Sequence, residues 1–136
     1  MPDRIALYWE IVVALRAEVD EVTLKYFDPS FVVYEDPGLP YGGTFYGPDA
    51  FIALRRKVSK FFALKILYIC AEPDGDRIAV VFSATGRPDA PTASVETVVT
   101  VLWTFVGEKA VEARVIYFDT PKVAAAFAGA EAASVS

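Results

Sequence analysis

The chain has 136 residues, of which 54% are hydrophobic, and a net charge of −5. This length predicts one domain, residues 1–136, that can bury a core without disulfides or metals. No apolar run approaches the roughly 18 residues of a membrane span and no signal peptide is expected, so we predict a cytoplasmic protein without membrane association. The acidic balance disfavours nucleic-acid binding, and the one basic cluster, Arg55-Arg56-Lys57 with Lys60, is predicted to be a solvated face. The excess of apolar residues predicts an internal cavity, a subunit interface or both, with an enlarged core as the alternative.

The first half of the chain predicts helices interrupted by one short strand. Apolar residues recur every three or four positions over residues 3–17, with Asp3 as N-cap, and again over 19–27. Residues 31–35 are β-branched and aromatic, which is typical of a strand. Proline at position 48 favours the first turn of a third helix.

The second half predicts a sheet followed by a short helix. A Pro-Asp-Gly-Asp turn indicates a hairpin, and alternation of apolar residues predicts strands at 65–72, 77–85, 94–106 and 110–118. Asp119 is placed to cap a last helix that ends near residue 128, and 129–136 are expected to be a frayed tail.

Alternation along the long strand assigns its two faces. The bulkier set is predicted to face the helices and consists of Thr97, Val99, Val101, Trp103 and Phe105. The other face mixes hydroxyl and apolar side chains, so we expect it to pair with a second copy of the chain in a homodimer. The whole pattern predicts an α+β fold. A curved, mainly antiparallel sheet wrapped by three helices of the N-terminal half would form a cone with a pocket at its wide end.

The chain contains no histidine and a single cysteine, Cys70. These counts exclude Ser-His-Asp and Cys-His catalysis, the common zinc sites and an intrachain disulfide. We expect no metal and no cofactor. If the protein is an enzyme, carboxylates and tyrosines must transfer its protons.

Two segments resemble a known group of proteins. "YEDPGLPYGG" at 34–43 and "VIYFDTPKVAAAF" at 115–127, together with the order of elements, look like the SnoaL-like branch of the NTF2-like superfamily. That superfamily also contains ketosteroid isomerases, limonene-epoxide hydrolases and polyketide cyclases. The resemblance covers roughly residues 4–128 and implies the NTF2-like, or cystatin-like, cone with a small-molecule pocket. It does not name a reaction, because this fold serves isomerisation, hydrolysis, cyclisation and plain binding.

The resemblance also implies candidate site residues. Tyr34-Glu35-Asp36-Pro37 is similar to the V-E-D-P of ketosteroid isomerases, whose aspartate shuttles the proton, so Asp36 is the candidate base. Glu35, next to it on the strand, should then point to solvent or an interface. Val101 falls where the isomerases have a neutral aspartic acid, and valine cannot donate a hydrogen bond. A ketosteroid isomerase activity is therefore not expected, and the carboxylate–arginine triad of the epoxide hydrolases is missing as well.

A SnoaL-type cyclase needs only a base and donors for an enolate oxygen. The candidate catalytic residues are Asp36, Asp119 as a second base, and Tyr34 as donor. Asp36 has a turn-forming alternative and Asp119 a helix-capping one. The pocket is predicted to be lined by Tyr8, Trp9, Tyr41, Tyr46, Phe61, Val99, Val101, Trp103 and Tyr117.

Two functions remain open at this level. The first is a cofactor-free isomerase or cyclase, or a hydrolase-like enzyme, acting on a small apolar molecule such as a polyketide or terpenoid. The second is a protein of the same fold that binds such a ligand without turnover.

Overall fold

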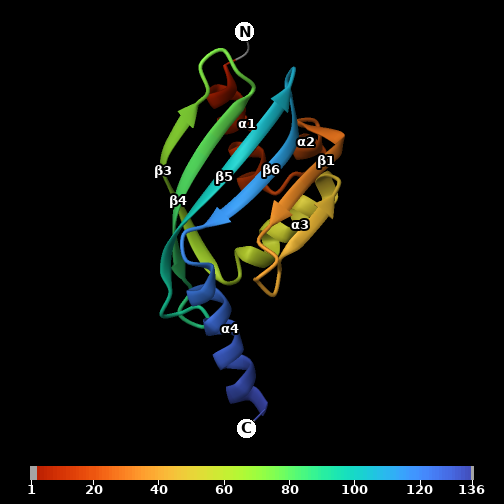
Figure 1. Ribbon diagram of the computed structural model, residues 1–136. Coiled ribbons are helices and arrows are strands. Elements are labelled where there is room, and N and C mark those ends of the chain that lie inside the picture. The colour runs from red at the N-terminus through yellow and green to blue at the C-terminus, as the bar shows by residue number, and fades with distance from the viewer. Residues whose placement is uncertain (1–2, 136) are drawn as a thin grey trace.

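The computed structural model describes residues 3–135 and consists of helices packed on one face of a curved sheet (Figure 1). The elements, in chain order, are α1 (Arg4–Ala17), α2 (Asp20–Leu24), β1 (Phe27–Glu35), β2 (Gly43–Tyr46), α3 (Pro48–Val58), β3 (Phe62–Ala71), β4 (Arg77–Gly86), β5 (Glu96–Val106), β6 (Lys109–Tyr117) and α4 (Thr120–Val135). Six strands form one sheet in the order β2-β1-β6-β5-β4-β3. All neighbouring strands are antiparallel except β1 and β6, which pair in parallel. The predicted α+β class is confirmed.

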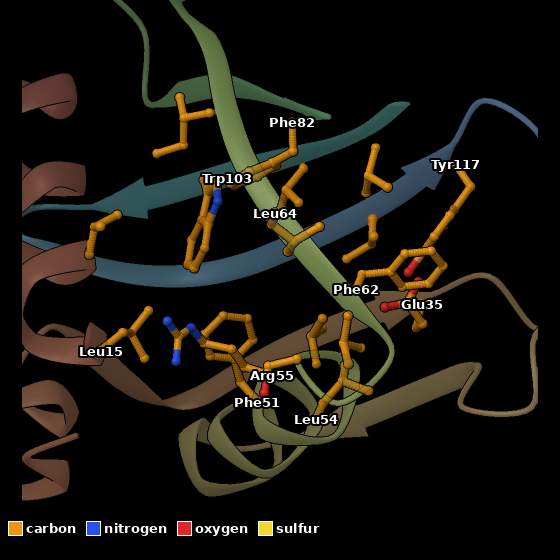
Figure 2. A pocket seen from close by; sticks show the side chains of 18 of the residues that line it. Leu15, Glu35, Phe51, Leu54, Arg55, Phe62, Leu64, Phe82, Trp103 and Tyr117 are labelled. Carbon is orange, nitrogen blue, oxygen red and sulfur yellow. The ribbon is translucent and has the colours of Figure 1, made fainter. Parts of the chain in front are cut away.

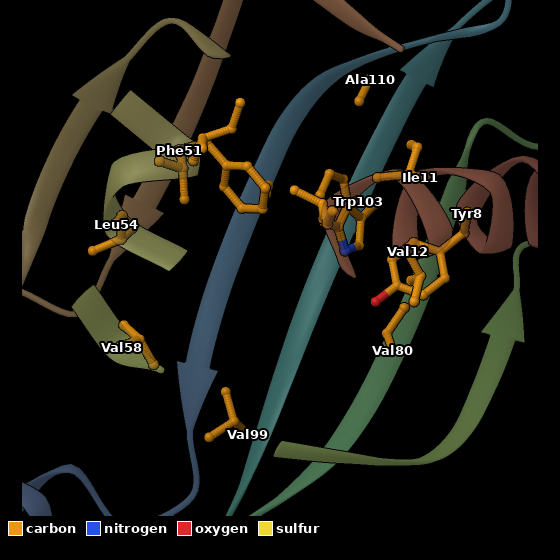
Figure 3. Close-up of a cluster of buried hydrophobic side chains, with 14 of the residues drawn as sticks. Tyr8, Ile11, Val12, Phe51, Leu54, Val58, Val80, Val99, Trp103 and Ala110 are labelled. Atoms are coloured by element: carbon orange, nitrogen blue, oxygen red, sulfur yellow. The ribbon is translucent and has the colours of Figure 1, made fainter. Parts of the chain in front are cut away.

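Helices α1 and α3 begin as their sequences predict. The Asp3 carboxylate accepts hydrogen bonds from the backbone N–H groups of Ile5 and Ala6 at 3.0 and 3.1 Å, which satisfies donors that a helix start leaves free. Helix α3 has Pro48 in its first turn. Side chains of both helices meet Trp103 of β5 in the core (Figure 3).

The prediction of a helix over 19–27 is wrong at its end. Helix α2 stops at Leu24, and Phe27 already belongs to β1, where it pairs with Ala110 of β6. The N–H group of Ala110 donates to the Tyr26 carbonyl oxygen at 2.8 Å, which draws this part of the chain into the sheet. Strand β2 was not predicted either; it pairs with β1 through Val32 and Tyr46.

The assignment of faces along β5 is confirmed. All five side chains predicted to face the helices point to the inner side, and the set is Thr97, Val99, Val101, Trp103 and Phe105. The outer side carries Val98 and Leu102, each 37% exposed, and β6 adds Ile116 at 47%. No helix covers this outer side of the sheet in Figure 1.

The last helix is longer than predicted. Helix α4 continues to Val135 rather than ending near residue 128, so 129–135 are helical and residue 136 lies outside the described part. Its alanine-rich sequence has a high intrinsic preference for helix. Val123 and Phe127 are buried and attach the helix to the end of the sheet, from which it runs outward in Figure 1. Within residues 3–135 we find no helix with the length and apolar character to cross a membrane.

Candidate functional site

A cavity of about 280 Å³ lies between α1, α3 and the inner face of the sheet (Figure 2). Most of its wall is apolar and comes from Val12, Leu15, Val33, Phe51, Leu54, Val58, Phe62, Leu64, Ile66, Phe82, Val99, Val101 and Val115. The polar and charged side chains of the wall, including three aromatic hydrogen-bond donors, are Tyr8, Arg16, Glu35, Arg55, Ser59, Arg87, Trp103 and Tyr117. A second hollow, of about 310 Å³, contacts α3 from the β2 side and includes no carboxyl group in its wall.

Glu35 is the one acidic side chain in the wall of this cavity among the described residues. It ends β1, where Phe31, Val33 and Glu35 alternate inward and are 0%, 0% and 5% exposed. Burial raises the pKa of Glu35 to about 8, and the nearby Asp36 charge adds to this, while a hydrogen bond from the Asp36 N–H at 3.4 Å opposes it. At neutral pH this carboxyl group is therefore mostly protonated.

Two tyrosine hydroxyls form a hydrogen-bonded pair at the same end of the cavity. The Tyr117 and Tyr41 oxygens are 2.7 Å apart, and Tyr117 is the one that lines the cavity. Figure 2 shows the Tyr117 hydroxyl and the Glu35 carboxyl directed toward one another. Burial raises the pKa of the Tyr41 phenol and of the Tyr117 phenol above the ordinary value, so both hydroxyl groups stay protonated and can donate hydrogen bonds.

The turn after β1 holds Tyr41 in place. Its backbone closes through hydrogen bonds from the Leu39 N–H to the Asp36 carbonyl at 3.1 Å and from the Gly42 N–H to the Leu39 carbonyl at 2.9 Å. A Cβ atom at Gly42 would lie 1.8 Å from the Asp36 carbonyl oxygen, so only glycine fits there.

The structure does not bring Asp36 to the cavity, so that part of the prediction is wrong. Its carboxylate accepts hydrogen bonds from the Gly38 N–H at 2.8 Å and from the Thr120 hydroxyl at 2.6 Å. The Thr120 bond, then the Gly38 bond, hold its pKa below the usual value. The physical reason is the strand alternation, because adjacent residues point to opposite sides and Glu35 takes the inward position. The turn-forming alternative for Asp36 is what the structure contains.

The other two candidate catalytic residues also lie outside the cavity wall. Asp119 accepts a hydrogen bond from the Lys122 N–H at 3.1 Å and so caps α4, as its alternative reading predicts. Tyr34 is on the outer face of the sheet, where the Arg114 guanidinium carbon lies 4.4 Å from the centre of its ring.

Five of the nine predicted lining residues are in the cavity wall: Tyr8, Val99, Val101, Trp103 and Tyr117. Trp9 and Tyr46 are instead 42% and 76% exposed, because they lie on the outward sides of α1 and β2. Tyr41 stands behind Tyr117, and Phe61 packs against Tyr41 and Phe127 at ring-centre distances of 6.1 and 4.9 Å.

Glu35 was predicted to point to solvent or an interface and Arg55 to lie on a solvated face; both predictions are wrong, because both side chains are in the cavity wall. Arg16 and Arg87 of the wall were not predicted at all. The alternation of Phe31, Val33 and Glu35 was a signal that could have identified the carboxyl group. Within residues 3–135, no group of three or more acidic or cysteine side chains is arranged to hold a metal ion.

Comparisons with solved structures identify the fold. An NTF2-like protein of Burkholderia xenovorans LB400 matches with a TM-score of 0.76 and 22% identity, over 90% of this chain and 93% of that one. A protein of Xanthomonas campestris described as having a cystatin-like fold matches with a TM-score of 0.74 and 17% identity, over 92% of this chain and 98% of that one. TerC, crystallised with polyporic acid, matches with a TM-score of 0.67 and 18% identity, over 86% of this chain and 92% of the TerC chain. No family model and no curated protein matches the sequence. The chain therefore has the NTF2-like fold, as the two sequence segments predict.

Proposed function

We propose that the chain binds a small, largely apolar molecule in the cavity and transfers a proton on it, with Glu35 as general acid–base. The observation that carries this proposal is a titratable carboxyl group, 5% exposed, at the end of an apolar cavity beside a neutral phenol. The reaction class is a cofactor-free isomerisation or cyclisation, as the likeness to SnoaL-like proteins suggests. A polyketide or terpenoid is the kind of molecule that this wall would accept.

The chemistry follows from the position of the two groups. With a pKa of about 8, roughly a tenth of Glu35 is ionised at pH 7 and can act as base, and the rest can act as acid. Ionised Glu35 would remove a proton from a carbon next to a carbonyl group, and the electron pair of the broken C–H bond would move to the carbonyl oxygen. The Tyr117 hydroxyl would donate a hydrogen bond to that enolate oxygen. Return of the proton from Glu35 to another carbon completes an isomerisation. Alternatively, the enolate carbon attacks a second carbonyl carbon and closes a ring, and the resulting alkoxide takes the proton from Glu35.

The comparison with TerC supports a small organic ligand, since that protein shares the fold and was crystallised with polyporic acid. Non-catalytic binding of such a ligand is the second candidate. It is favoured by the large apolar share of the wall, which offers packing surface but few groups for chemistry.

The test uses 2-tetralone, an apolar ketone with exchangeable α-hydrogens, in D2O. The wild-type protein should accelerate hydrogen–deuterium exchange at the α-carbon, and Glu35→Gln should reduce the acceleration at least about a hundredfold. Asp36→Asn is the matched control, because it removes the neighbouring carboxylate outside the cavity, and it should exchange at nearly the wild-type rate. Binding of 2-tetralone without acceleration would favour the non-catalytic candidate. Equal rates in wild type and Glu35→Gln would remove Glu35 as the base.

We also propose that two copies of the chain pair through the uncovered outer face of the sheet. Its centre is apolar, with Val98, Leu102 and Ile116 partly exposed. Arg114 and Glu112, 3.7 Å apart, flank this centre. An apolar centre with a charged rim is the usual composition of a protein interface.

A further inference from the structure

The charged groups of the cavity are unevenly distributed. Glu35 lies with Tyr117 at one end, and Arg55 lies beside Leu15 and Phe51 at the other end in Figure 2. Arg16, next in sequence to Leu15, is also in the wall and is exposed. Arg87 is exposed as well, but it lies beside Phe62, and its side chain already donates to the Ser59 carbonyl oxygen. Arg16 and Arg55 therefore make one end of the cavity cationic, and the other end carries a carboxyl group that is mostly protonated at neutral pH.

The arginines of this end have no carboxylate partner among the described residues. Each ion pair of the described chain uses another arginine: Arg4, Arg56, Arg77 or Arg114. Arg56, next in sequence to Arg55, pairs with Asp20 at 2.8 Å. Arg55 is about half buried, which lowers its pKa; Glu18 is close enough to raise it but forms no ion pair, and Arg16 and Arg56 are close enough to lower it further. A guanidinium group held this way is stabilised when an anion arrives.

Two neutral donors face the same space. The Trp103 side chain is 3% exposed, and its Nε1–H has no hydrogen-bond partner within residues 3–135. Tyr8 packs against it edge to face, with ring centres 5.6 Å apart. In Figure 3 the Trp103 nitrogen and the Tyr8 hydroxyl point toward the same side, and both residues are in the cavity wall. A buried donor without an acceptor is costly, so an acceptor atom on a ligand would be favoured there.

The Tyr8 hydroxyl links these donors to the arginines. Tyr8, Arg16 and Arg55 all line the cavity; burial raises the pKa of Tyr8, and the charges of Arg16 and Arg55 oppose this rise. Tyr8, Trp103, Arg16 and Arg55 thus form one group of donors and positive charges, which we call the donor end. The Glu35, Tyr41 and Tyr117 group is the carboxyl end.

We propose that the ligand is an organic acid: an apolar, two-ring-sized body whose carboxylate sits at the donor end and whose neutral carbonyl or hydroxyl reaches Glu35 and Tyr117. The inference rests on the proposed function, because it assigns the ligand class of the same cavity. The orientation is fixed by charge, since an anionic group next to Glu35 would be repelled by any ionised fraction of that carboxylate. A volume of about 280 Å³ is consistent with a body of this size.

The test compares two probes that differ only in charge, 6-hydroxy-2-naphthoate and 6-hydroxy-2-naphthamide, by isothermal titration calorimetry at pH 7 and low salt. The acid should bind at least about tenfold more tightly than the amide. Arg55→Gln should lower the affinity for the acid about tenfold and change the affinity for the amide less than about threefold. Arg56→Gln removes an adjacent charge that does not line the cavity and is the matched control, with both affinities unchanged. Arg16→Gln, at an exposed position, provides a second variant whose folding is not at risk.

The outcomes separate this inference from the proposed function. If the amide binds as tightly as the acid, or Arg55→Gln and Arg16→Gln weaken both probes equally, the organic-acid inference is overturned. The proposed function then still stands if Glu35→Gln abolishes the exchange of 2-tetralone. If neither probe binds with a Kd below about 1 mM, and the protein does not accelerate exchange of the α-hydrogens of 2-tetralone, both proposals fail together.

Discussion

Replacing Glu35 by glutamine should change how the stability of the protein depends on pH. The pKa of Glu35 is about 8 in the folded chain and 4.5 in the absence of burial. Between these values the folded state holds a proton that the unfolded state has released, so the free energy of unfolding falls as pH rises. The stabilising contribution of the neutral carboxyl is complete below about pH 4.5 and is lost as pH rises through about 8. Glutamine is neutral throughout and has no such dependence.

The size of the effect follows from the shift. A change from 4.5 to about 8 corresponds to about 5 kcal/mol at most. Only part of this loss falls between about pH 5 and pH 9, and water entering the cavity lowers it further, so we expect the wild type to lose about 2–4 kcal/mol relative to Glu35→Gln over that range. That loss is a large part of the 5–15 kcal/mol by which domains are typically stable.

The measurement is urea unfolding followed by tryptophan fluorescence, in steps of pH, for both proteins. Asp36→Asn is the control with the opposite sign, because hydrogen bonds from Thr120 and Gly38 lower the pKa of Asp36. The stabilising contribution of the Asp36 carboxylate is present above the ordinary aspartate pKa and is lost as pH falls below it. This loss lies outside the pH range in which Glu35 changes stability, about 4.5 to about 8. A difference between wild type and Glu35→Gln that stays constant within about 0.5 kcal/mol across the range would refute the reasoning.

Further outcomes are expected from the site and the sheet. Tyr117→Phe leaves the buried Tyr41 hydroxyl without its partner and should cost about 1–3 kcal/mol in urea unfolding, and unchanged stability would contradict the pair. Gly42→Ala should destabilise by more than about 2 kcal/mol, since its Cβ meets a carbonyl oxygen at 1.8 Å, and a wild-type melting temperature would show that the turn can relax. Ile116→Lys should convert a dimer into monomers in sedimentation velocity, and a monomeric wild type at tens of micromolar would exclude sheet pairing. Exchange of 2-tetralone should rise with pH to a plateau with a midpoint near 8, and a profile without this step would argue against Glu35 as base.

The parts of the fold that sequence predicts well are those fixed by neighbours in the chain. The Asp3 cap and the inward set of β5 depend on local hydrogen bonding and on the two-residue repeat of a strand. Phe27 is different, because its apolar spacing suits a helix and only the distant Ala110 draws it into β1. Pairing between residues so far apart leaves no local pattern.

The candidate site shows the same limit at single-residue scale. Similarity to a known motif pointed to Asp36, whereas the phase of β1 places Glu35 in the cavity. Phe31 and Val33 carry that phase in the sequence, but the similarity of residues 34–37 to a known motif was given more weight. Arg55 was predicted to be on a solvated face, and its position at the cavity depends on how α3 lies across the sheet.

The parallel pairing of β1 with β6 sets the order in which a newly made chain can fold. Val33 pairs with Ala113, so the strand that carries Glu35 joins the main sheet only after most of the chain has been synthesised. Until then β1 and β2 have only each other and α3 to pack against, and closing so long a loop is slow. A ribosome-bound chain that ends within β5 would thus expose the apolar side of β1, which is the kind of surface that chaperones bind. Because Tyr117 ends β6, the wall around Glu35 is complete only in a chain whose β6 has been synthesised and has paired.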